Sequence, residues 1–111
     1  MHHYIPKRGD IIYINFDPQA GFEIQKRRPA LVLSPTIYNE KGKLLLCCPI
    51  TSTIRNGPWE ILLPKNLETK GVILTDRVKS MDWYAREAKK IEHCPKNIFS
   101  EVLERINLLL S

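Results

Sequence analysis

The sequence predicts a small, mainly β fold, a barrel or a sandwich, with one amphipathic helix at its C-terminal end. Three observations lead to this prediction. The chain has 111 residues, which suits a single domain over residues 1–111, because two separate cores would each be too small to bury enough surface. Short apolar segments, rich in β-branched and aromatic residues, recur between Gly, Pro and Asn turn signals. In the last segment, by contrast, apolar residues repeat at spacings of three and four.

The first strand is expected at Ile11–Phe16. Gly9-Asp10 opens this apolar run, and Asp17-Pro18 closes it as a turn. A polar loop that contains a glycine then runs from Gln19 to Arg27 without helical or strand periodicity. Loops of this kind on rigid barrels often carry function, so we expect functional residues in it.

The second strand is expected at Ala30–Leu33, a short continuous apolar run that is typical of a buried strand. Pro29 favours extended backbone at Arg28, just before this strand. Turn signals bound four further expected strands: Lys43–Pro49, Trp59–Leu63, Gly71–Thr75 and Lys89–Glu92. The C-terminal helix is expected to begin at Pro95 and to pack on the barrel. Its apolar residues are Ile98, Phe99, Val102, Leu103, Ile106, Leu109 and Leu110.

The charge and the apolar runs narrow the classes of partner. Lysine and arginine number 17 against 12 aspartates and glutamates, a net charge of +5. This balance favours a polyanionic partner, although it is also common among proteins that have none. No apolar run approaches the roughly 20 residues that span a bilayer. We therefore expect a soluble, cytoplasmic protein without a membrane segment.

The cysteines and histidines predict neither a disulfide framework nor a metal site. There are three cysteines, an odd number, and no signal peptide precedes them. Cys47 and Cys48 are adjacent in an expected strand, so they point to opposite faces and are poorly placed to bind one metal. His2 and His3, taken with His93-Cys94, lack the spacing of any common zinc motif. No metal or other cofactor is expected.

A carboxylate, a guanidinium and two hydroxyls fall at expected strand ends. Glu23 lies on the polar loop, Arg28 precedes the second strand, and Thr51 and Ser52 follow the third. Taken singly, these residues are explained by a solvated loop, a surface ion pair and a turn. Together they match what cleavage of RNA without a metal needs: a base for the 2′-hydroxyl, a cation for the phosphoryl oxygens, and a proton source for the leaving 5′-oxygen.

The order and spacing of several segments favour the functional interpretation over the structural one. The segments are Gly9-Asp10-Ile11-Ile12, Phe16-Asp17-Pro18, Gly21 with Glu23, Arg28-Pro29-Ala30-Leu31-Val32-Leu33-Ser34, Pro49-Ile50-Thr51-Ser52, Thr75-Asp76-Arg77-Val78-Lys79-Ser80 and Arg105-Ile106-Asn107-Leu108-Leu109. In this order the chain resembles the MazF/PemK family, the ribonuclease toxins of bacterial toxin-antitoxin pairs. The resemblance runs from Gly9 nearly to Ser111.

The resemblance implies both a fold and an activity. The fold is an SH3-like barrel of the CcdB/PemK type that forms a symmetric homodimer. The activity is sequence-specific, metal-independent cleavage of single-stranded messenger RNA, which leaves a 2′,3′-cyclic phosphate and a 5′-hydroxyl and so inhibits translation and growth. A cognate antitoxin protein holds such an enzyme inactive.

The resemblance also implies roles for single residues. Arg28 stabilises the pentacoordinate phosphorus and is a possible proton donor to the leaving group, because its planar fork matches phosphate oxygens. Thr51 binds and orients the scissile phosphate, and Glu23 is the base or holds Arg28 in place. One branch of the family pairs an acid at Asp76 with an arginine two residues earlier, where this chain has Leu74. Asp76 is therefore a general base or, equally well, the cap of a turn.

A further set of residues is expected to bind the RNA. Phe22 stands in a polar loop, where it either stacks on a base or covers a dimer interface. The cations expected along the RNA backbone are Lys26, Arg27, Lys79 and Arg86. Ser52 and Arg77 are expected either to bind the RNA or to take part in catalysis. Trp59 and Trp83 are expected to be packing residues at the barrel surface or an interface, and Tyr4 and Tyr13 core or rim residues.

Two alternatives come from other classes, since a fold does not settle a function. A toxin on the same barrel can inhibit a protein, as gyrase-poisoning CcdB relatives do, but those lack the Arg28-Pro29 strand entry and have an aromatic-containing tail. This chain ends Leu108-Leu109-Leu110-Ser111. A noncatalytic SH3-like RNA-binding module would need the basic loop, but not the combination of carboxylate, guanidinium and hydroxyl.

Overall fold

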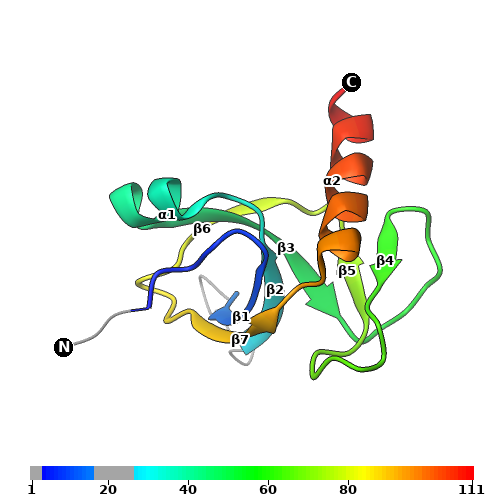
Figure 1. Cartoon of the computed structure of the whole chain (residues 1–111), viewed down its shortest axis with the longest axis horizontal. Coiled ribbons are helices and arrows are strands. Elements are labelled where there is room, and N and C mark those ends of the chain that lie inside the picture. The colour runs from blue at the N-terminus through cyan, green and yellow to red at the C-terminus, as the bar shows by residue number, and fades with distance from the viewer. Residues whose placement is uncertain (1–3, 17–26) are drawn as a thin grey trace, which may run out of the picture.

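The computed structural model describes residues 4–16 and 27–111 of the chain. Its described part contains seven strands in a strongly curved antiparallel sheet and two helices (Figure 1). The elements are β1 (Asp10–Asn15), β2 (Arg27–Val32), α1 (Thr36–Gly42), β3 (Leu44–Thr51), β4 (Glu60–Leu62), β5 (Val72–Leu74), β6 (Lys79–Asp82), β7 (Lys89–His93) and α2 (Lys96–Leu110). The mainly β fold with a C-terminal helix is as expected from the sequence.

Strand β3 joins the two halves of the sheet. The strand order is β4-β5-β3-β2-β1-β7, and β6 pairs with β3 beside this path. The first half of β3 pairs with β6, with Leu45 opposite Met81, and its end pairs with β5, with Ile50 opposite Ile73. The C-terminal end of β3 therefore lies where β2 and β5 flank it on either side.

Two core clusters fill the two sides of the sheet. The first lies between the sheet and α2 and contains Ile11, Leu31, Leu33, Cys48, Ile50, Ile61, Leu63, Ile73, Cys94, Ile98 and Val102. The second contains Ile12, Ile14, Ala30, Val32, Leu45, Cys47, Met81 and Trp83. Cys47 and Cys48 belong to different clusters, as the alternation along a strand predicts. Each fully buried aliphatic side chain contributes about 1.5–3 kcal/mol.

Two elements were not predicted, helix α1 and strand β6. Only Asn39 is buried among the seven residues of α1, while Ile37 is 66% exposed, so no apolar periodicity marks this helix. It ends at Lys43, whose φ of 60° takes the left-handed conformation common after a helix. In β6 only Met81 is buried, and so short an element carries no alternating signal.

The C-terminal helix packs on the sheet along only part of its length. Ile98 and Val102 are buried in the first core cluster, as predicted. The predicted packing of this helix on the barrel is confirmed for its first turns, whereas its last turns are exposed. Leu109 is 44% and Leu110 79% exposed, because the last turns of α2 extend beyond the sheet (Figure 1).

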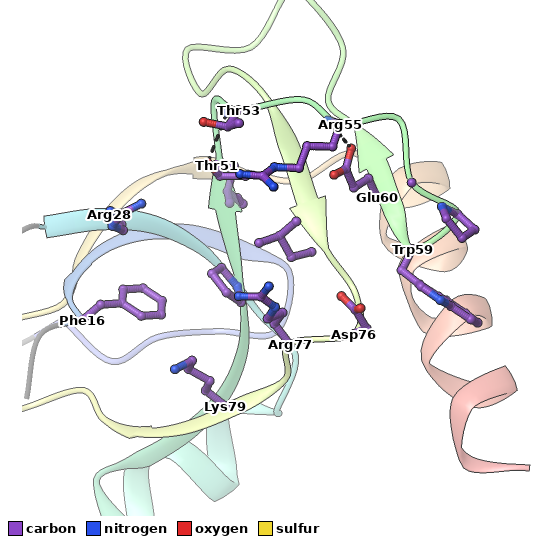
Figure 2. Close-up of a pocket in the computed structure, with 15 residues that line it drawn as sticks. Phe16, Arg28, Thr51, Thr53, Arg55, Trp59, Glu60, Asp76, Arg77 and Lys79 are labelled. Atoms are coloured by element: carbon purple, nitrogen blue, oxygen red, sulfur yellow. Dashed lines mark hydrogen bonds between the residues drawn. The ribbon is translucent and has the colours of Figure 1, made fainter.

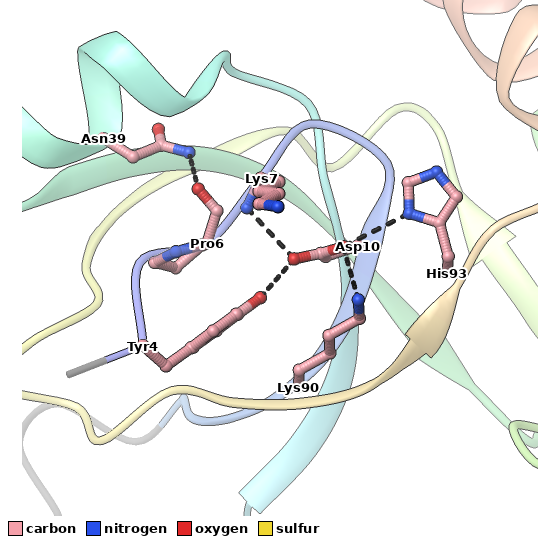
Figure 3. A network of polar contacts seen from close by, with 7 residues as sticks. All are labelled: Tyr4, Pro6, Lys7, Asp10, Asn39, Lys90 and His93. Carbon is pink, nitrogen blue, oxygen red and sulfur yellow. Dashed lines mark hydrogen bonds and ion pairs between the residues drawn. The ribbon is translucent and has the colours of Figure 1, made fainter. Parts of the chain in front are cut away.

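The Asp10 cluster ties the start of β1 to β7 and to the N-terminal segment (Figure 3). The buried Asp10 carboxylate accepts hydrogen bonds from the Tyr4 hydroxyl and, at 3.1 Å, from the Lys7 backbone N–H. Its other oxygen lies 3.2 Å from His93 Nδ1 and 3.6 Å from Lys90 Nζ. Burial and the neighbouring carboxylate raise the pKa of Tyr4 well above its usual value. The cluster therefore satisfies a buried charge from four directions.

Gly9 makes room for this cluster. Its φ is +92°, and a Cβ there would lie 2.8 Å from the His93 ring. Any other residue would be strained and would displace His93 from Asp10.

Neither of the two described helices has the length and apolar character that crossing a membrane requires.

Candidate active site

An open pocket of about 680 Å³ lies at the C-terminal end of β3. We call it the cationic pocket; Figure 2 shows it between β2, the start of β6 and the segment that leads into β4. Its lining is Phe16, Arg28, Pro49, Ile50, Thr51, Thr53, Arg55, Gly57, Pro58, Trp59, Glu60, Leu74, Asp76, Arg77 and Lys79. It thus gathers side chains from four separate stretches of the chain.

Thr51 is the last residue of β3, and contacts fix both its side chain and its backbone. Its Oγ1 accepts a hydrogen bond from the Thr53 N–H at 3.2 Å, which leaves its own proton available to a ligand. Gly71, with a φ of +115°, packs against its carbonyl: a Cβ there would lie 2.0 Å from the Thr51 oxygen. Only glycine at position 71 therefore lets Thr51 take this place in the pocket.

Arg28 and Thr51 line the same pocket from neighbouring strands. Arg28 pairs with Ile14 inside the sheet, because β2 begins at Arg27 rather than at Ala30 as expected. Within residues 4–16 and 27–111, no hydrogen bond or ion pair is made by the side chains of Arg28, Arg77 or Lys79. The pocket therefore presents three cations that have no partner in the part of the chain that the structure describes, a surface suited to a phosphate-bearing ligand.

Arg27 lies outside the pocket, although it is adjacent to Arg28. Its guanidinium donates to the Glu87 carbonyl at 2.8 Å and lies 3.8 Å from the Glu87 carboxylate. Successive strand residues point to opposite faces. The alternation thus turns Arg28 toward the pocket and Arg27 toward the connection between β6 and β7.

Asp76 lines the pocket from the turn after β5, where the Arg77 N–H donates to the Leu74 carbonyl at 3.2 Å. No hydrogen bond of the Asp76 carboxylate is found in the described part of the chain, so it is exposed to a ligand. Burial raises the pKa of Cys48 to about 12, with smaller contributions from Cys47 and from the charge of Asp76. That thiol is therefore no candidate nucleophile.

The remaining predicted site residues are spread more widely. Ser52 follows Thr51 but is not part of the pocket lining. Arg86 donates from its guanidinium to the Asn15 carbonyl at 2.9 Å, which fastens the end of β1. Glu23, Phe22 and Lys26 lie outside the described residues.

Ten of the fifteen lining residues were not among the predicted site residues, and four of these have large or charged side chains: Phe16, Arg55, Trp59 and Glu60. Phe16 was expected to end the first strand, and Trp59 was expected to pack at the barrel surface or an interface. Trp83 does pack, being 3% exposed, with its indole N–H bonded to the Asn39 carbonyl. Trp59, unlike Trp83, lines the pocket, because it lies at the start of a strand next to Gly57-Pro58. This position after a turn was the sequence signal that could have identified it as a site residue.

The pocket holds two carboxylates, Glu60 and Asp76. Across the ranges that the structure describes, no group of three or more His, Cys, Asp or Glu side chains is placed to hold a metal ion. The arrangement of cations around a hydroxyl is suited to binding a phosphodiester and to stabilising charge on its oxygens.

Comparisons with known proteins agree with this geometry. Residues 7–110 match the family of PemK-like, MazF-like toxins of type II toxin-antitoxin systems. The chain is 40% identical over 107 residues to the endoribonuclease toxin MazF of Escherichia coli K12, covering 96% of both chains. It is similar to a crystal structure of MazE-MazF from Deinococcus radiodurans, with a TM-score of 0.93, 42% identity and 97% of both chains covered.

A more distant structure supports the fold alone. An endoribonuclease from a mycobacterial species, solved with its cognate antitoxin, has a TM-score of 0.77 at 15% identity, over 95% of this chain and 94% of the other. The resemblance inferred from the sequence motifs is confirmed. This chain belongs to the PemK-like, MazF-like toxin family of type II toxin-antitoxin systems.

Proposed function

We propose that this chain is an endoribonuclease toxin that cleaves single-stranded messenger RNA in the cationic pocket and thereby inhibits translation and growth. The observation that carries the proposal is the meeting of Arg28 and Thr51 in one open pocket with Arg77 and Lys79. Cations without internal partners are costly to crowd together unless an anion joins them. A phosphodiester backbone is an anion of the right kind.

The proposed reaction is a transfer within the RNA. The 2′-oxygen loses its proton and bonds to phosphorus while the bond from phosphorus to the 5′-oxygen breaks, which leaves a 2′,3′-cyclic phosphate and a 5′-hydroxyl. Arg28 stabilises the charge on the phosphoryl oxygens and is the proposed proton donor to the 5′-oxygen. The Thr51 hydroxyl orients the phosphate.

Glu23 is the first candidate for the base that accepts the 2′-hydroxyl proton. Its alternative role is to hold Arg28 in place. Asp76 is the second candidate, and its carboxylate lines the pocket opposite Arg28 (Figure 2). The two assignments differ in their consequences. Asp76→Asn lowers the rate strongly only if Asp76 accepts the proton.

The similar proteins suggest partners for this chain. The Escherichia coli relative is named an endoribonuclease toxin, and the Deinococcus radiodurans structure contains MazE with MazF. We extend this to a cognate antitoxin that blocks the toxin, a homodimer of single-domain chains, and action in the cytoplasm, where messenger RNA is translated.

The test is digestion of a long single-stranded RNA by the purified protein in EDTA. We expect cleavage without added metal and, by mass spectrometry, a cyclic phosphate on the upstream fragments. The matched control is a pair of oligonucleotides that contain one cut site from this RNA. They differ only in a 2′-deoxy residue at the cut position, and the deoxy oligonucleotide is expected to stay intact. Cleavage of the deoxy oligonucleotide, or RNA binding without any cutting, would contradict the proposal; the second result would favour the noncatalytic RNA-binding alternative.

A further inference from the structure

The segment of residues 53–58 forms one wall of the cationic pocket, with Thr53, Arg55, Gly57 and Pro58 in the lining. It has no regular secondary structure, since it lies between β3 and β4. A wall of this kind needs other contacts to hold its shape. Besides the hydrogen bonds of the Thr53 N–H to Thr51 and of the Glu60 N–H to the Gly57 carbonyl, three contacts from the side chains of Glu60 and Arg105 fix it.

The first two contacts are made by one carboxylate. Glu60 Oε1 accepts hydrogen bonds from the backbone N–H groups of Arg55, at 3.1 Å, and Asn56, at 3.0 Å. Asn56 takes a φ of 59°, a conformation that asparagine tolerates better than most residues. Glu60, the first residue of β4, therefore folds the segment back over the pocket.

The third contact comes from the C-terminal helix. Arg105 on α2 donates from its guanidinium to the Pro58 carbonyl at 2.6 Å, and the same side chain lies 3.9 Å from the Glu101 carboxylate. Pro58 is thus fastened to a helix that packs on the first core cluster. The C-terminal end of the segment is therefore held by Arg105, a residue that has no part in the proposed reaction.

The result of these contacts is the placement of Arg55. Its side chain is exposed, lines the pocket, and extends from the segment in the direction of Thr51 in Figure 2. Among the described residues its guanidinium has no hydrogen-bond or ion-pair partner, although its backbone N–H is bonded to Glu60. Arg55 is therefore a fourth cation directed into the same space.

We propose that Arg55 binds an RNA phosphate next to the scissile one, and that Glu60 and Arg105 are positioning residues that hold residues 53–58 so that Arg55 reaches it. The proposal rests on the proposed function, since it adds a substrate contact to that site. Arg55 then contributes to binding rather than to the chemical step, because Arg28 and Thr51 carry the reaction.

The first test measures cleavage kinetics and salt dependence for Arg55→Gln. We expect KM to rise about tenfold with kcat within about twofold, as for the loss of one charged contact. The slope of log affinity against log salt should fall by about 0.7, the value for one phosphate on a single strand. Lys41→Gln on α1, which removes the same charge far from the pocket, is the matched control. An unchanged KM and slope for Arg55→Gln would overturn the proposal.

The second test asks whether Glu60 acts through Arg55. Glu60→Ala should raise KM about as much as Arg55→Gln, and the double variant should be no worse than Arg55→Gln alone. Glu60→Gln keeps an oxygen acceptor and should restore KM to within about threefold of the parent. Glu40→Ala on α1 is the control. Independent, multiplying effects in the double variant would contradict the positioning role.

The third test separates the Pro58 contact from the ion pair on α2. Arg105→Met removes both contacts and should raise KM, whereas Glu101→Gln removes only the ion pair and should leave KM unchanged. Melting curves of each variant are measured first, so that KM is determined at a temperature at which all variants are folded. Equal KM values for the two variants would overturn the role of Arg105.

A noncleavable oligonucleotide distinguishes failure of this proposal from failure of the proposed function. An RNA with a 2′-O-methyl group at the cut site reports binding by fluorescence anisotropy even when nothing is cut. A parent protein that cuts no RNA contradicts the proposed function. Weaker binding by Arg55→Gln supports the contact independently, and unchanged binding refutes it.

Discussion

The cationic pocket and the Asp10 cluster are both rich in charge, but they treat it in opposite ways. In the Asp10 cluster a carboxylate that is 1% exposed has partners on both oxygens, including Tyr4, His93 and Lys90. In the pocket, Arg28 and its neighbouring cations stand open to solvent with no partner in the described residues.

The difference separates groups that hold the fold from groups that await a ligand. A buried carboxylate needs its partners to offset its lost hydration, so the Asp10 cluster contributes to stability. Exposed cations around a hydroxyl contribute little to stability, but they raise the local concentration of an anion. Changes in the two regions should therefore affect different measurements.

The largest stability effect is expected for Asp10→Asn. The neutral amide weakens the contacts to Lys90 and His93 and places an N–H group beside donors, so we expect a loss of about 2–3 kcal/mol in the free energy of unfolding. Urea denaturation measures it. Glu104→Gln, an exposed change on α2, is the control. Asp10→Asn should cut RNA at the parent rate per folded molecule, and a selective loss of cleavage would remove the distinction between the two regions.

The next effect concerns Thr51 in the pocket. Thr51→Val keeps the shape of the side chain but lacks the hydroxyl, so we expect kcat to fall about 10–100-fold, the value of one hydrogen bond to a charged group. Thr51→Ser retains the hydroxyl and should keep most of the activity. Initial rates on one oligonucleotide compare the two variants. Equal rates for serine and valine would show that the hydroxyl takes no part.

A smaller effect, with a pH signature, is expected at Glu92 on β7. Its carboxylate accepts hydrogen bonds from the Thr69 hydroxyl at 2.6 Å and from the Thr69 and Glu68 N–H groups. Partial burial raises its pKa, but these hydrogen bonds outweigh it and lower the pKa below its usual value. A lowered pKa stabilises the fold above the unfolded value, about 4.3, and this contribution is lost as the pH falls through the native pKa.

Glu92→Gln should therefore lose about 1–2 kcal/mol near neutral pH. The gap from the parent should narrow as the pH falls through the lowered native pKa of Glu92. Urea unfolding at several pH values measures this gap. A gap that stays constant with pH would show that the charge of Glu92 is not what Thr69 stabilises.

The smallest expected signal is the reactivity of the thiols. Burial raises the pKa of Cys47 to about 12, and that of Cys94 to about 11. The native thiols thus stay protonated at pH 8, and a thiol reagent should label them only as fast as the protein unfolds. Because unfolded thiols ionise near pH 8.5, stability should fall as the pH rises above this value. Rapid labelling of the native protein would show that the reagent reaches the two core clusters without unfolding, and would contradict this prediction.

The sequence predicted the regular, apolar parts of the fold better than the parts shaped by single contacts. The strand expected at Ile11–Phe16 was located because its run of β-branched and aromatic residues and its bounding turns are local signals. The burial of Asp10 was not predicted, since its partners Lys90 and His93 come from a distant part of the chain. Helix α1 escaped prediction for another reason: its one buried residue is polar.

The candidate site shows the same limit. Arg28 and Thr51 were identified from motif order, and the structure places both in one pocket. Arg27 and Arg28 look alike in sequence, and only strand alternation assigns one to Glu87 and the other to the pocket. The role of Glu60 depends on two backbone N–H groups, and no residue pattern reveals such contacts.

The most direct test of the central claim is single-turnover cleavage of RNA by Arg28→Ala in EDTA, with thermal unfolding measured on the same sample. We expect the cleavage rate to fall by about 10²–10³, because a donor to the reacting phosphate is lost. The melting temperature should stay at the parent value, because the Arg28 side chain has no hydrogen-bond or ion-pair partner among residues 4–16 and 27–111. Cleavage at the parent rate, or a rate loss that only follows unfolding, would contradict the assignment of the pocket as the active site.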